Sequence, residues 1–378
     1  MELVNNRRVI FGSGSYCEIP GILKKQGKSR VFLLAYNAEA DCVRRVQEEL
    51  TEGGIEQVLF DRVTGEPHLA LVDSAVALCR QNTCDCVLAI GGGSVIDTAK
   101  LVAMLATNDG YCEDYQLNRR SVRNQPLFYI AMPTTCGTGA EATKVAVVFN
   151  EKEGWKKAVY DNSMIADTVI LDPIAIAELP TKIAVFTGMD AIVHAIESMV
   201  SNGANAISQM YSLAALRLLY SNITKIVDNP EDESAQTNML LGSYIAGIAL
   251  TVGAGLAHIV GQPLGALYHV PHGASCSIFL LPTMRLNKDY AKPQFLQIAQ
   301  ALAIRCDGRT YDEVFEELIS VLSEMMEKID APRRLCDYYP ADLDIEAALD
   351  NIQSCMSHIK SNPRPSERSL WRELLQMA

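Results

Sequence analysis

The chain has 378 residues, 49% hydrophobic and 21% charged, so about two globular domains are expected. Its net charge of −12 opposes the basic surface that nucleic-acid binding requires, and we expect no nucleic-acid partner. Eleven cysteines at irregular spacing argue against a disulfide framework and favour free thiols. The first residues lack the long apolar stretch of a secretory signal, so the expected location is the cytoplasm.

The first half of the chain alternates apolar, β-rich runs with helical patterns. This alternation is typical of an α/β domain with a largely parallel sheet. In chain order we expect a strand at 31–35, a helix at 38–52, a strand at 57–60, a helix at 68–81, a strand at 86–90, a helix from about 95 and a strand at 127–131. Cys84 and Cys86 begin the third of these strands and are expected in its core.

After Asp172-Pro173 the pattern becomes almost entirely helical. We place the boundary near residue 183, which gives an α/β domain over 1–183 and an all-helical domain over 184–378. Thr310 and Glu313 have the spacing of a capping box in front of a helix over 311–329. Because no low-complexity linker separates the halves, we expect a tight pair of domains with the functional site in the cleft between them.

Residues 234–284 contain no Asp, Glu, Lys or Arg, which by itself permits a membrane interpretation. The stretch nevertheless contains residues that are costly in lipid, namely His258, Gln262, Pro263, His269, Pro271 and His272. Its many glycines and alanines suit close helix packing in a protein core. We therefore expect no membrane association.

Two glycine-containing loops each follow a predicted strand. The first is Gly91-Gly92-Gly93-Ser94, where glycines permit a close backbone approach and the following helix offers free N–H donors to a phosphate. Taken alone, a tight strand-to-helix turn explains it equally well. The second loop, 133–141, contains Thr134, Thr135 and Thr138. Since ligands bind at the carboxyl edge of parallel sheets, the two loops together favour a nucleotide site.

Only six histidines are present, and three of them belong to a pattern that favours a metal site. Asp190 and His194 are one helical turn apart and therefore project from the same face. His258 and His272 can complete the set. Each of these residues alone is more simply explained as a surface carboxylate or a core histidine. Together, one Asp and three His suit Fe²⁺ or Zn²⁺.

Six motifs occur in a fixed order along nearly the whole chain. They are FGSG at 11–14, GGGSVIDTAK at 91–100, PTTCGTGAE at 133–141, LDP at 171–173, GMDAIVHAIE at 188–197 and PHG at 271–273. With these motifs the sequence resembles the iron-containing, group III alcohol dehydrogenase family.

The resemblance implies a fold, a metal and a cofactor. The fold is an α/β dinucleotide-binding domain followed by an all-α domain, with metal and cofactor in the cleft between them, and the assembly is a homodimer. The implied metal is Fe²⁺, bound by Asp190, His194, His258 and His272. The implied contacts to NAD or NADP are Gly92, Gly93, Ser94, Asp97, Thr134, Thr135 and Thr138, with Lys156 near the nicotinamide ribose.

Two departures from the family pattern limit what can be carried over. Many relatives have a histidine one helical turn after the third metal ligand, whereas this chain has Gln262, which cannot relay a proton. His269 is then a candidate for the proton relay, beside water and the ribose hydroxyls. Members that prefer NAD carry an Asp after the first strand, but here Tyr36 and Asn37 occupy this place. We therefore expect Tyr36 at the ribose and leave the choice between NAD and NADP open.

The predicted activity is hydride transfer between NAD(P) and a small primary alcohol or aldehyde. Within the family the loops at 133–139 and 268–273 look most like those of 4-hydroxybutyrate dehydrogenases, which makes 4-hydroxybutyrate and succinate semialdehyde the candidate substrates. The alternative is a lyase of the dehydroquinate-synthase type that uses NAD transiently. The Asp190 ligand and the lack of a basic cluster for a phosphorylated substrate weigh against the lyase, and the cofactor loops weigh against a non-catalytic metal-binding protein.

Overall fold

The computed structural model describes residues 4–153, 155–355 and 359–378. These residues form two compact units. The first contains the chain up to Thr135 together with Gly139–Leu179, and the second contains Cys136–Thr138 together with Pro180–Ala378. The short segment Cys136–Thr138, from the middle of the second predicted loop, thus packs with the helical unit.

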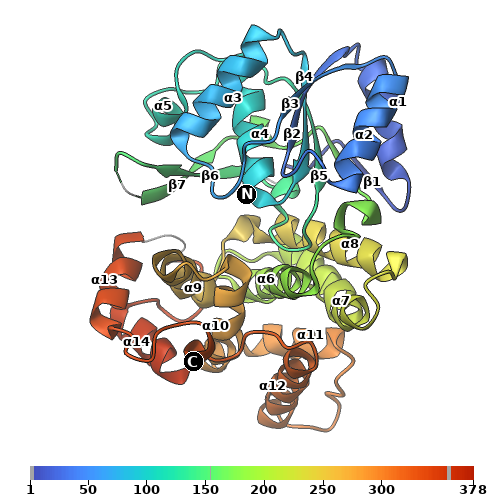
Figure 1. Ribbon diagram of the computed structural model, residues 1–378. Helices are drawn as coiled ribbons and strands as arrows, with labels where there is room; N and C mark the ends of the chain where they lie inside the picture. The colour runs from blue at the N-terminus through green and yellow to red at the C-terminus, as the bar shows by residue number, and fades with distance from the viewer. Residues whose placement is uncertain (1–3, 154, 356–358) are drawn as a thin grey trace. The chain divides into compact units, whose positions relative to one another are not determined.

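A parallel sheet of six strands forms the centre of the first unit (Figure 1). Its strand order is β1-β8-β5-β4-β2-β3. The bounds are β1 Arg8–Phe11, β2 Arg30–Ala35, β3 Glu56–Phe60, β4 Cys86–Gly91, β5 Phe128–Pro133 and β8 Thr168–Leu171. The four strands predicted from the sequence are confirmed within one or two residues, and Cys84 and Cys86 are buried as expected.

Helices connect these strands, as a parallel sheet requires. They are α1 Ile19–Lys25, α2 Asp41–Glu52, α3 Leu69–Gln81, α4 Gly93–Ala106 and α5 Cys112–Gln116. Helix α4 begins two residues earlier than the sequence indicated, directly after the glycine pair that ends β4. An antiparallel hairpin, β6 Val145–Asn150 with β7 Trp155–Tyr160, was not predicted.

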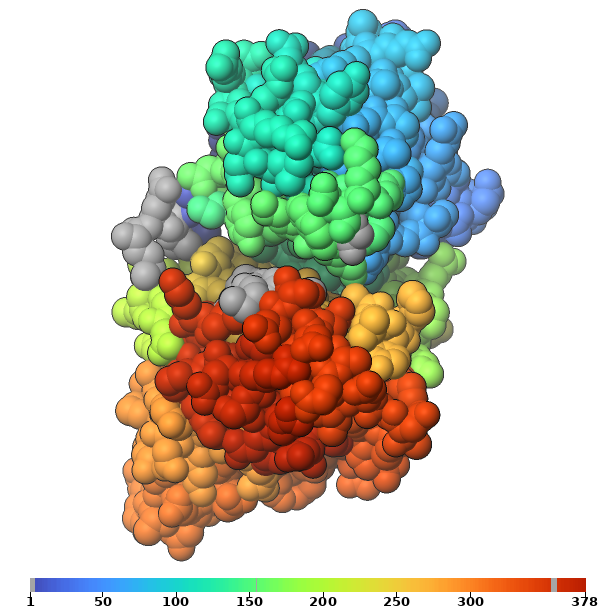
Figure 2. Space-filling view, turned by 90° about the vertical axis from the view of Figure 1, so that its left-hand side faces the viewer, coloured from blue at the N-terminus to red at the C-terminus, as the bar shows by residue number. Residues whose placement is uncertain are grey.

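Helices are the only regular secondary structure among the described residues of the second unit, which confirms the expected change of pattern. Its helices are α6 Thr181–Val200, α7 Ala206–Asp228, α8 Glu233–Ala249, α9 Leu256–Tyr268, α10 His272–Asn287, α11 Lys292–Ala301, α12 Tyr311–Lys328, α13 Ile345–Cys355 and α14 Arg368–Met377. The capping box at Thr310 and Glu313 is present in front of α12. Helices α13 and α14, red in Figure 2, contact α9 and α10 respectively.

Helix α6 has the length and apolar composition of a membrane span, but 89% of its most apolar 18-residue window is buried inside the protein. The uncharged stretch at 234–284 is bent, since Glu233–Val252 and Leu256–Tyr268 meet at 104°. This burial fits the expectation that the apolar helices form a protein core.

A buried ion pair fixes α4 to the hairpin. The Lys100 side chain is fully buried, and its Nζ donates to Asp97 Oδ1 at 3.0 Å and to the Val145 carbonyl at 2.5 Å. The other Asp97 oxygen accepts from the Val147 backbone N–H at 2.9 Å. Because every polar group of this pair is hydrogen-bonded, the charges are tolerated at a position that desolvates them.

Glu141 is also buried close to Lys100, but among the described residues its carboxyl group has no ion pair like that of Asp97. Its exposed fraction is 1%, and burial raises its pKa from 4.5 to about 7, although Lys100 acts in the opposite direction. Between pH 4.5 and 7 the unfolded chain therefore loses this proton while the folded chain keeps it. Stability must fall as the pH rises through this window.

We expect Glu141→Gln to remove this loss of stability, because the amide cannot ionise. The variant should match the wild type near pH 4.5 and exceed it by on the order of 3 kcal/mol at pH 7 and above. Urea unfolding at several pH values measures the difference. Parallel pH profiles for the two proteins would contradict the buried, protonated carboxyl.

Candidate functional site

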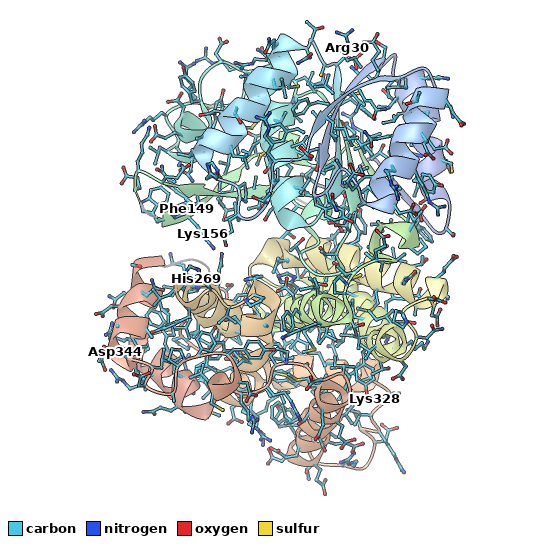
Figure 3. All side chains as sticks on the ribbon, viewed as in Figure 1. Arg30, Phe149, Lys156, His269, Lys328 and Asp344 are labelled. Carbon is cyan, nitrogen blue, oxygen red and sulfur yellow. The ribbon has the colours of Figure 1, made fainter. Side chains whose placement is uncertain are left out.

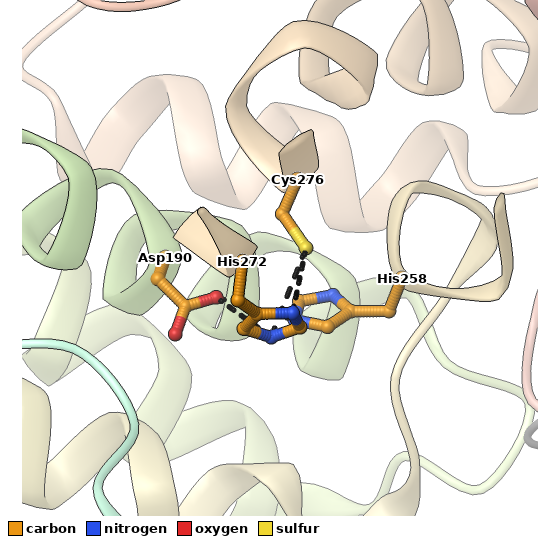
Figure 4. A group of neighbouring side chains, drawn as sticks. All are labelled: Asp190, His258, His272 and Cys276. Carbon is orange, nitrogen blue, oxygen red and sulfur yellow. Dashed lines mark hydrogen bonds and ion pairs between the residues drawn. The ribbon is translucent and has the colours of Figure 1, made fainter. Parts of the chain in front are cut away.

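The four residues predicted as metal ligands come together in the helical unit (Figure 4 shows three of them). Asp190 and His194 lie on α6, His258 on α9 and His272 on α10. Asp190 Oδ1 is 3.4 Å from His258 Nε2, 3.5 Å from His272 Nε2 and 3.8 Å from His194 Nε2. One carboxylate oxygen is thus surrounded by three imidazole nitrogens.

Most of this cluster is buried, and several of its polar atoms have no hydrogen-bond partner. The side chains of Asp190, His194 and His258 are at most 5% exposed, whereas that of His272 is 42% exposed. Asp190 Oδ1, His194 Nδ1 and His258 Nε2 are buried atoms without a partner among the described residues. Since buried polar atoms are normally satisfied, these atoms indicate a missing ligand. The exposed His272 leaves one side of the cluster accessible.

Glu197, one turn beyond His194 on α6, orients the third histidine. Its Oε2 accepts from His258 Nδ1 at 2.7 Å, which leaves Nε2 as the nitrogen that faces Asp190. The same carboxylate accepts the backbone N–H groups of Gly255 and Ala257 at 2.8 and 2.6 Å. Glu197 therefore caps the start of α9 and fixes the imidazole at once.

The charges of the cluster suit a cation. Burial disfavours the ionised form of Asp190, but the neighbouring histidines outweigh burial and hold its pKa well below the usual range. Burial lowers the pKa of His194 to about 4, so this imidazole is neutral at pH 7 and keeps a lone pair for a metal. Although burial acts against it, Cys276 and Asp190 raise the pKa of His272 to about 9. Against the same effect of burial, Cys276 and Glu197 raise the pKa of His258. These two imidazoles must therefore release a proton when a metal binds. An anionic carboxylate and deprotonated imidazoles are the donors that Fe²⁺ and Zn²⁺ prefer.

A fifth side chain, Cys276, belongs to the same cluster. The donor atoms of Asp190, His258, His272 and Cys276 all lie within 4.8 Å of one another. The sequence reasoning missed Cys276 and gave Glu197 no role. Both carried a signal, because Glu197 and Cys276 follow His194 and His272 at helical spacings of three and four residues. His272 itself is the first residue of α10.

The predicted cofactor residues of the first unit gather at one edge of the sheet. Strands β5, β4 and β2 are neighbours and parallel, so Thr134, Gly92 and Tyr36 all follow carboxyl ends at the same edge. The Tyr36 N–H donates to Ile90 and the Thr134 N–H to Gly91, each at 3.1 Å. Between β2 and β4 the chain reverses its direction of travel across the sheet, which is where α/β proteins bind ligands.

The glycine loop has the close packing that a phosphate cradle needs. A Cβ on Gly91 would approach the Val95 side chain to 2.5 Å, and a Cβ on Gly92 would meet the Thr135 side chain at 3.3 Å. Gly92 is the N-cap of α4, and Gly93 and Ser94 form its first turn, where backbone N–H groups are unpaired. No side chain caps this end of the helix. Its N–H groups can therefore bind an anion.

The other predicted residues differ in their surroundings. Lys156 lies on β7 and is paired with Glu66, and both Asp97 oxygens bind Lys100 and Val147. Thr138 belongs to the segment that packs on α6, where a Cβ on Gly137 would meet Thr187 at 2.8 Å.

His269, labelled with Lys156 in Figure 3, ends α9 in a left-handed conformation with φ of 56°. Its side chain is exposed, and within the described ranges it has no hydrogen bond or ion pair with the metal-ligand cluster. The structure thus brings Asp190, His194, His258 and His272 together, whereas His269 lies outside this cluster.

Comparison with known proteins covers nearly the whole chain. The pattern of the family described as iron-containing alcohol dehydrogenase matches residues 6–173, and that of the Fe-containing alcohol dehydrogenase family, C-terminal, matches residues 184–378. The probable alcohol dehydrogenase EutG of Escherichia coli is 32% identical over 94% of this chain and 89% of its own length. The NAD-dependent methanol dehydrogenase of Bacillus methanolicus is 29% identical over 94% and 93%.

Solved structures are also similar to this chain over its full length. The sulfoacetaldehyde reductase of Bifidobacterium kashiwanohense, crystallised in complex with NAD⁺, has a TM-score of 0.90 with 25% identity, over 100% of this chain and 98% of its own. The two matching patterns together span both units of the fold. This chain belongs to the iron-containing alcohol dehydrogenase family.

Proposed function

We propose that this alcohol and aldehyde oxidoreductase holds its iron in the cluster on α6, α9 and α10 and its NAD(P) at the carboxyl edge of the sheet. The observation that carries the proposal is the set of buried, unpartnered donor atoms on Asp190, His194 and His258. His272 Nε2 lies 3.5 Å from the same Asp190 oxygen and supplies the fourth donor. These residues fit Fe²⁺ and also accept Zn²⁺.

A metal bound here supplies Lewis-acid polarisation of an alcohol or aldehyde oxygen. The residues of the chain do the remaining work. Glu197 holds His258 in the tautomer that presents Nε2, and the buried walls exclude water from the donors on α6. The accessible side at His272 is where a substrate enters. Gln262 does not titrate near neutral pH, so we keep His269 as the proposed proton relay, supported by its exposure.

The proposed cofactor is NAD or NADP. Its diphosphate is expected at the first turn of α4, on Gly92, Gly93 and Ser94. The neighbouring loop contributes Thr134 and Thr135. Asp97 and Lys156 are expected to contribute indirectly, because Asp97 already binds Lys100 and Lys156 is paired with Glu66. Relatives that are named as NAD-dependent or were solved with NAD⁺ support this assignment.

The proposed substrate is a small primary alcohol or its aldehyde, with 4-hydroxybutyrate and succinate semialdehyde as the first pair to test. We choose both because the loops at 133–139 and 268–273 resemble those of 4-hydroxybutyrate dehydrogenases. We also propose a cytoplasmic location, and a homodimer as the resemblance to the family implies. The lyase alternative predicts no net change of the cofactor, so cofactor turnover separates the two activities.

Small aldehydes, including succinate semialdehyde, should oxidise NADH or NADPH when Fe²⁺ is supplied anaerobically. Asp190→Ala should lose the metal and reduce kcat/KM by at least about a thousandfold, because it removes the one carboxylate in the cluster. Metal analysis, circular dichroism and steady-state kinetics measure this. The exposed Asp228→Ala is the matched control. A folded Asp190→Ala protein with full metal content and normal rate would refute the ligand assignment.

Glu197→Gln should weaken metal binding by about 10–100-fold, since the carboxylate that orients His258 becomes an amide. The relevant measurement is the metal dissociation constant from chelator competition. Glu327→Gln, on a side chain that is 71% exposed, serves as the control. Equal affinities for the Glu197 and Glu327 variants would mean that Glu197 caps α9 without positioning the ligand.

Tyr36 should let the enzyme accept both cofactors, because no carboxylate at this position repels a 2′-phosphate. We expect kcat/KM for NADH and NADPH to differ by less than about a hundredfold, roughly 2.7 kcal/mol. Tyr36→Asp should shift the preference towards NADH, while Tyr36→Phe should leave it unchanged. A wild-type enzyme strictly specific for NADH would show that another residue binds the ribose.

A further inference from the structure

Cys276 has surroundings that an ordinary core cysteine does not have. Its side chain is fully buried on α10. Its Sγ lies 3.9 Å from His272 Nε2 and 4.0 Å from His272 Nδ1, as the dashed lines of Figure 4 mark. Its hydrogen-bond partner among the described residues is His272, and a ring nitrogen of His258 lies within 4.8 Å of the sulfur. The thiol therefore lies beside two of the proposed metal ligands.

The spacing on α10 repeats the spacing on α6. Asp190 and His194 are separated by four residues, and so are His272 and Cys276. A separation of four places two side chains on one helix face, one turn apart. The donor atoms of Asp190, His272, Cys276 and, on α9, His258 all lie within 4.8 Å of one another, and His194 Nε2 lies 3.8 Å from Asp190 Oδ1.

The distances fit a single metal centre. In a five-coordinate centre, bonds of about 2.1 Å to nitrogen or oxygen and about 2.3 Å to sulfur place neighbouring donors about 3.0–3.6 Å apart, or about 3.1–3.8 Å when one of them is sulfur. The corresponding distances here are 3.4 Å between His258 and Asp190, 3.5 Å between His272 and Asp190, and 3.9 Å between Cys276 and His272. The buried, unpartnered atoms Asp190 Oδ1 and His258 Nε2 are directed into the same space.

We propose that Cys276 binds the metal of this site through its sulfur, as a donor in addition to the Asp and three His of the proposed function on which this inference rests. The thiol proton is released to solvent as the sulfur–metal bond forms. Asp190 and Cys276 then balance the two charges of a divalent cation. A sulfur donor also selects Fe²⁺, Co²⁺ and Zn²⁺ against Mg²⁺ and Mn²⁺.

Cobalt substitution tests the sulfur bond without relying on turnover. Purified protein is stripped of metal and loaded with one equivalent of Co²⁺, and its absorption spectrum is recorded. We expect visible ligand-field bands together with an intense thiolate-to-cobalt charge-transfer band in the near ultraviolet. Cys276→Ser should keep the ligand-field bands and lose the charge-transfer band. Cys306→Ser, at a half-buried thiol of the same unit, should keep both.

Zinc affinity gives a second readout. Chelator competition should show a loss of at least about tenfold for Cys276→Ser and Cys276→Ala, since the sulfur donor is removed in both. Circular dichroism confirms that the variants are folded.

The outcomes separate this inference from the proposed function. Stoichiometric Co²⁺ binding with ligand-field bands but no charge-transfer band in the wild type would overturn the sulfur bond and leave the Asp and His ligands in place. A charge-transfer band that survives in Cys276→Ser, or unchanged zinc affinity, would also overturn it. If the wild type takes up no Co²⁺ or Zn²⁺, the proposed metal site itself is wrong. The wild-type spectrum decides the question even where a variant fails to fold.

Discussion

The buried carboxylate of Asp190 is the constraint around which the helical unit is organised. It is 2% exposed, and its Oδ1 has no hydrogen-bond donor among the described residues. An isolated charge in such a place costs several kcal/mol unless a partner compensates it. Three imidazoles approach this oxygen to within 3.8 Å. His194, with a pKa near 4, is neutral at pH 7, whereas the pKa values of His258 and His272 are raised and these two compensate the carboxylate by holding protons that a metal would displace. A divalent cation at this point would neutralise the buried charge and bind the unpaired nitrogens.

Small residues make this convergence of helices sterically feasible. A Cβ on Gly273, the neighbour of His272, would lie 2.1 Å from the Phe186 carbonyl oxygen, so the start of α10 rests directly on the backbone of α6. A Cβ on Gly255 would collide with the Glu197 carboxylate at 2.9 Å. Glycine at these positions allows backbone and ligand-bearing side chains to approach more closely than any other residue permits. The apolar, uncharged composition of 234–284 follows from the same packing.

The sequence predicted the elements and ligands whose signals are local. The four central strands are continuous apolar runs, and the capping box at Thr310 has a fixed spacing, so both were found. Strands β1 and β8 have only four residues each, and the β6–β7 hairpin lacks a two-residue turn signal, so these three features were missed. Glu197 and Cys276 were not assigned because their roles depend on α9 and α10 lying against α6.

The surroundings of Tyr36 show how tertiary structure modifies a conclusion drawn from one position. The sequence has no acidic side chain there, but Glu178, distant in the chain, lies close enough to act with burial in raising the pKa of the Tyr36 phenol. Its Oε2 also accepts the Asp41 N–H at 3.4 Å, next to the start of α2. The fold therefore places a carboxylate near the strand end, where the local sequence has none. In solvent, two unit charges 4 Å apart interact by only about 1 kcal/mol, a factor of about five, and salt weakens this further. For the ribose position proposed at Tyr36, such a charge would favour a cofactor without the 2′-phosphate, but it is too weak to exclude NADPH.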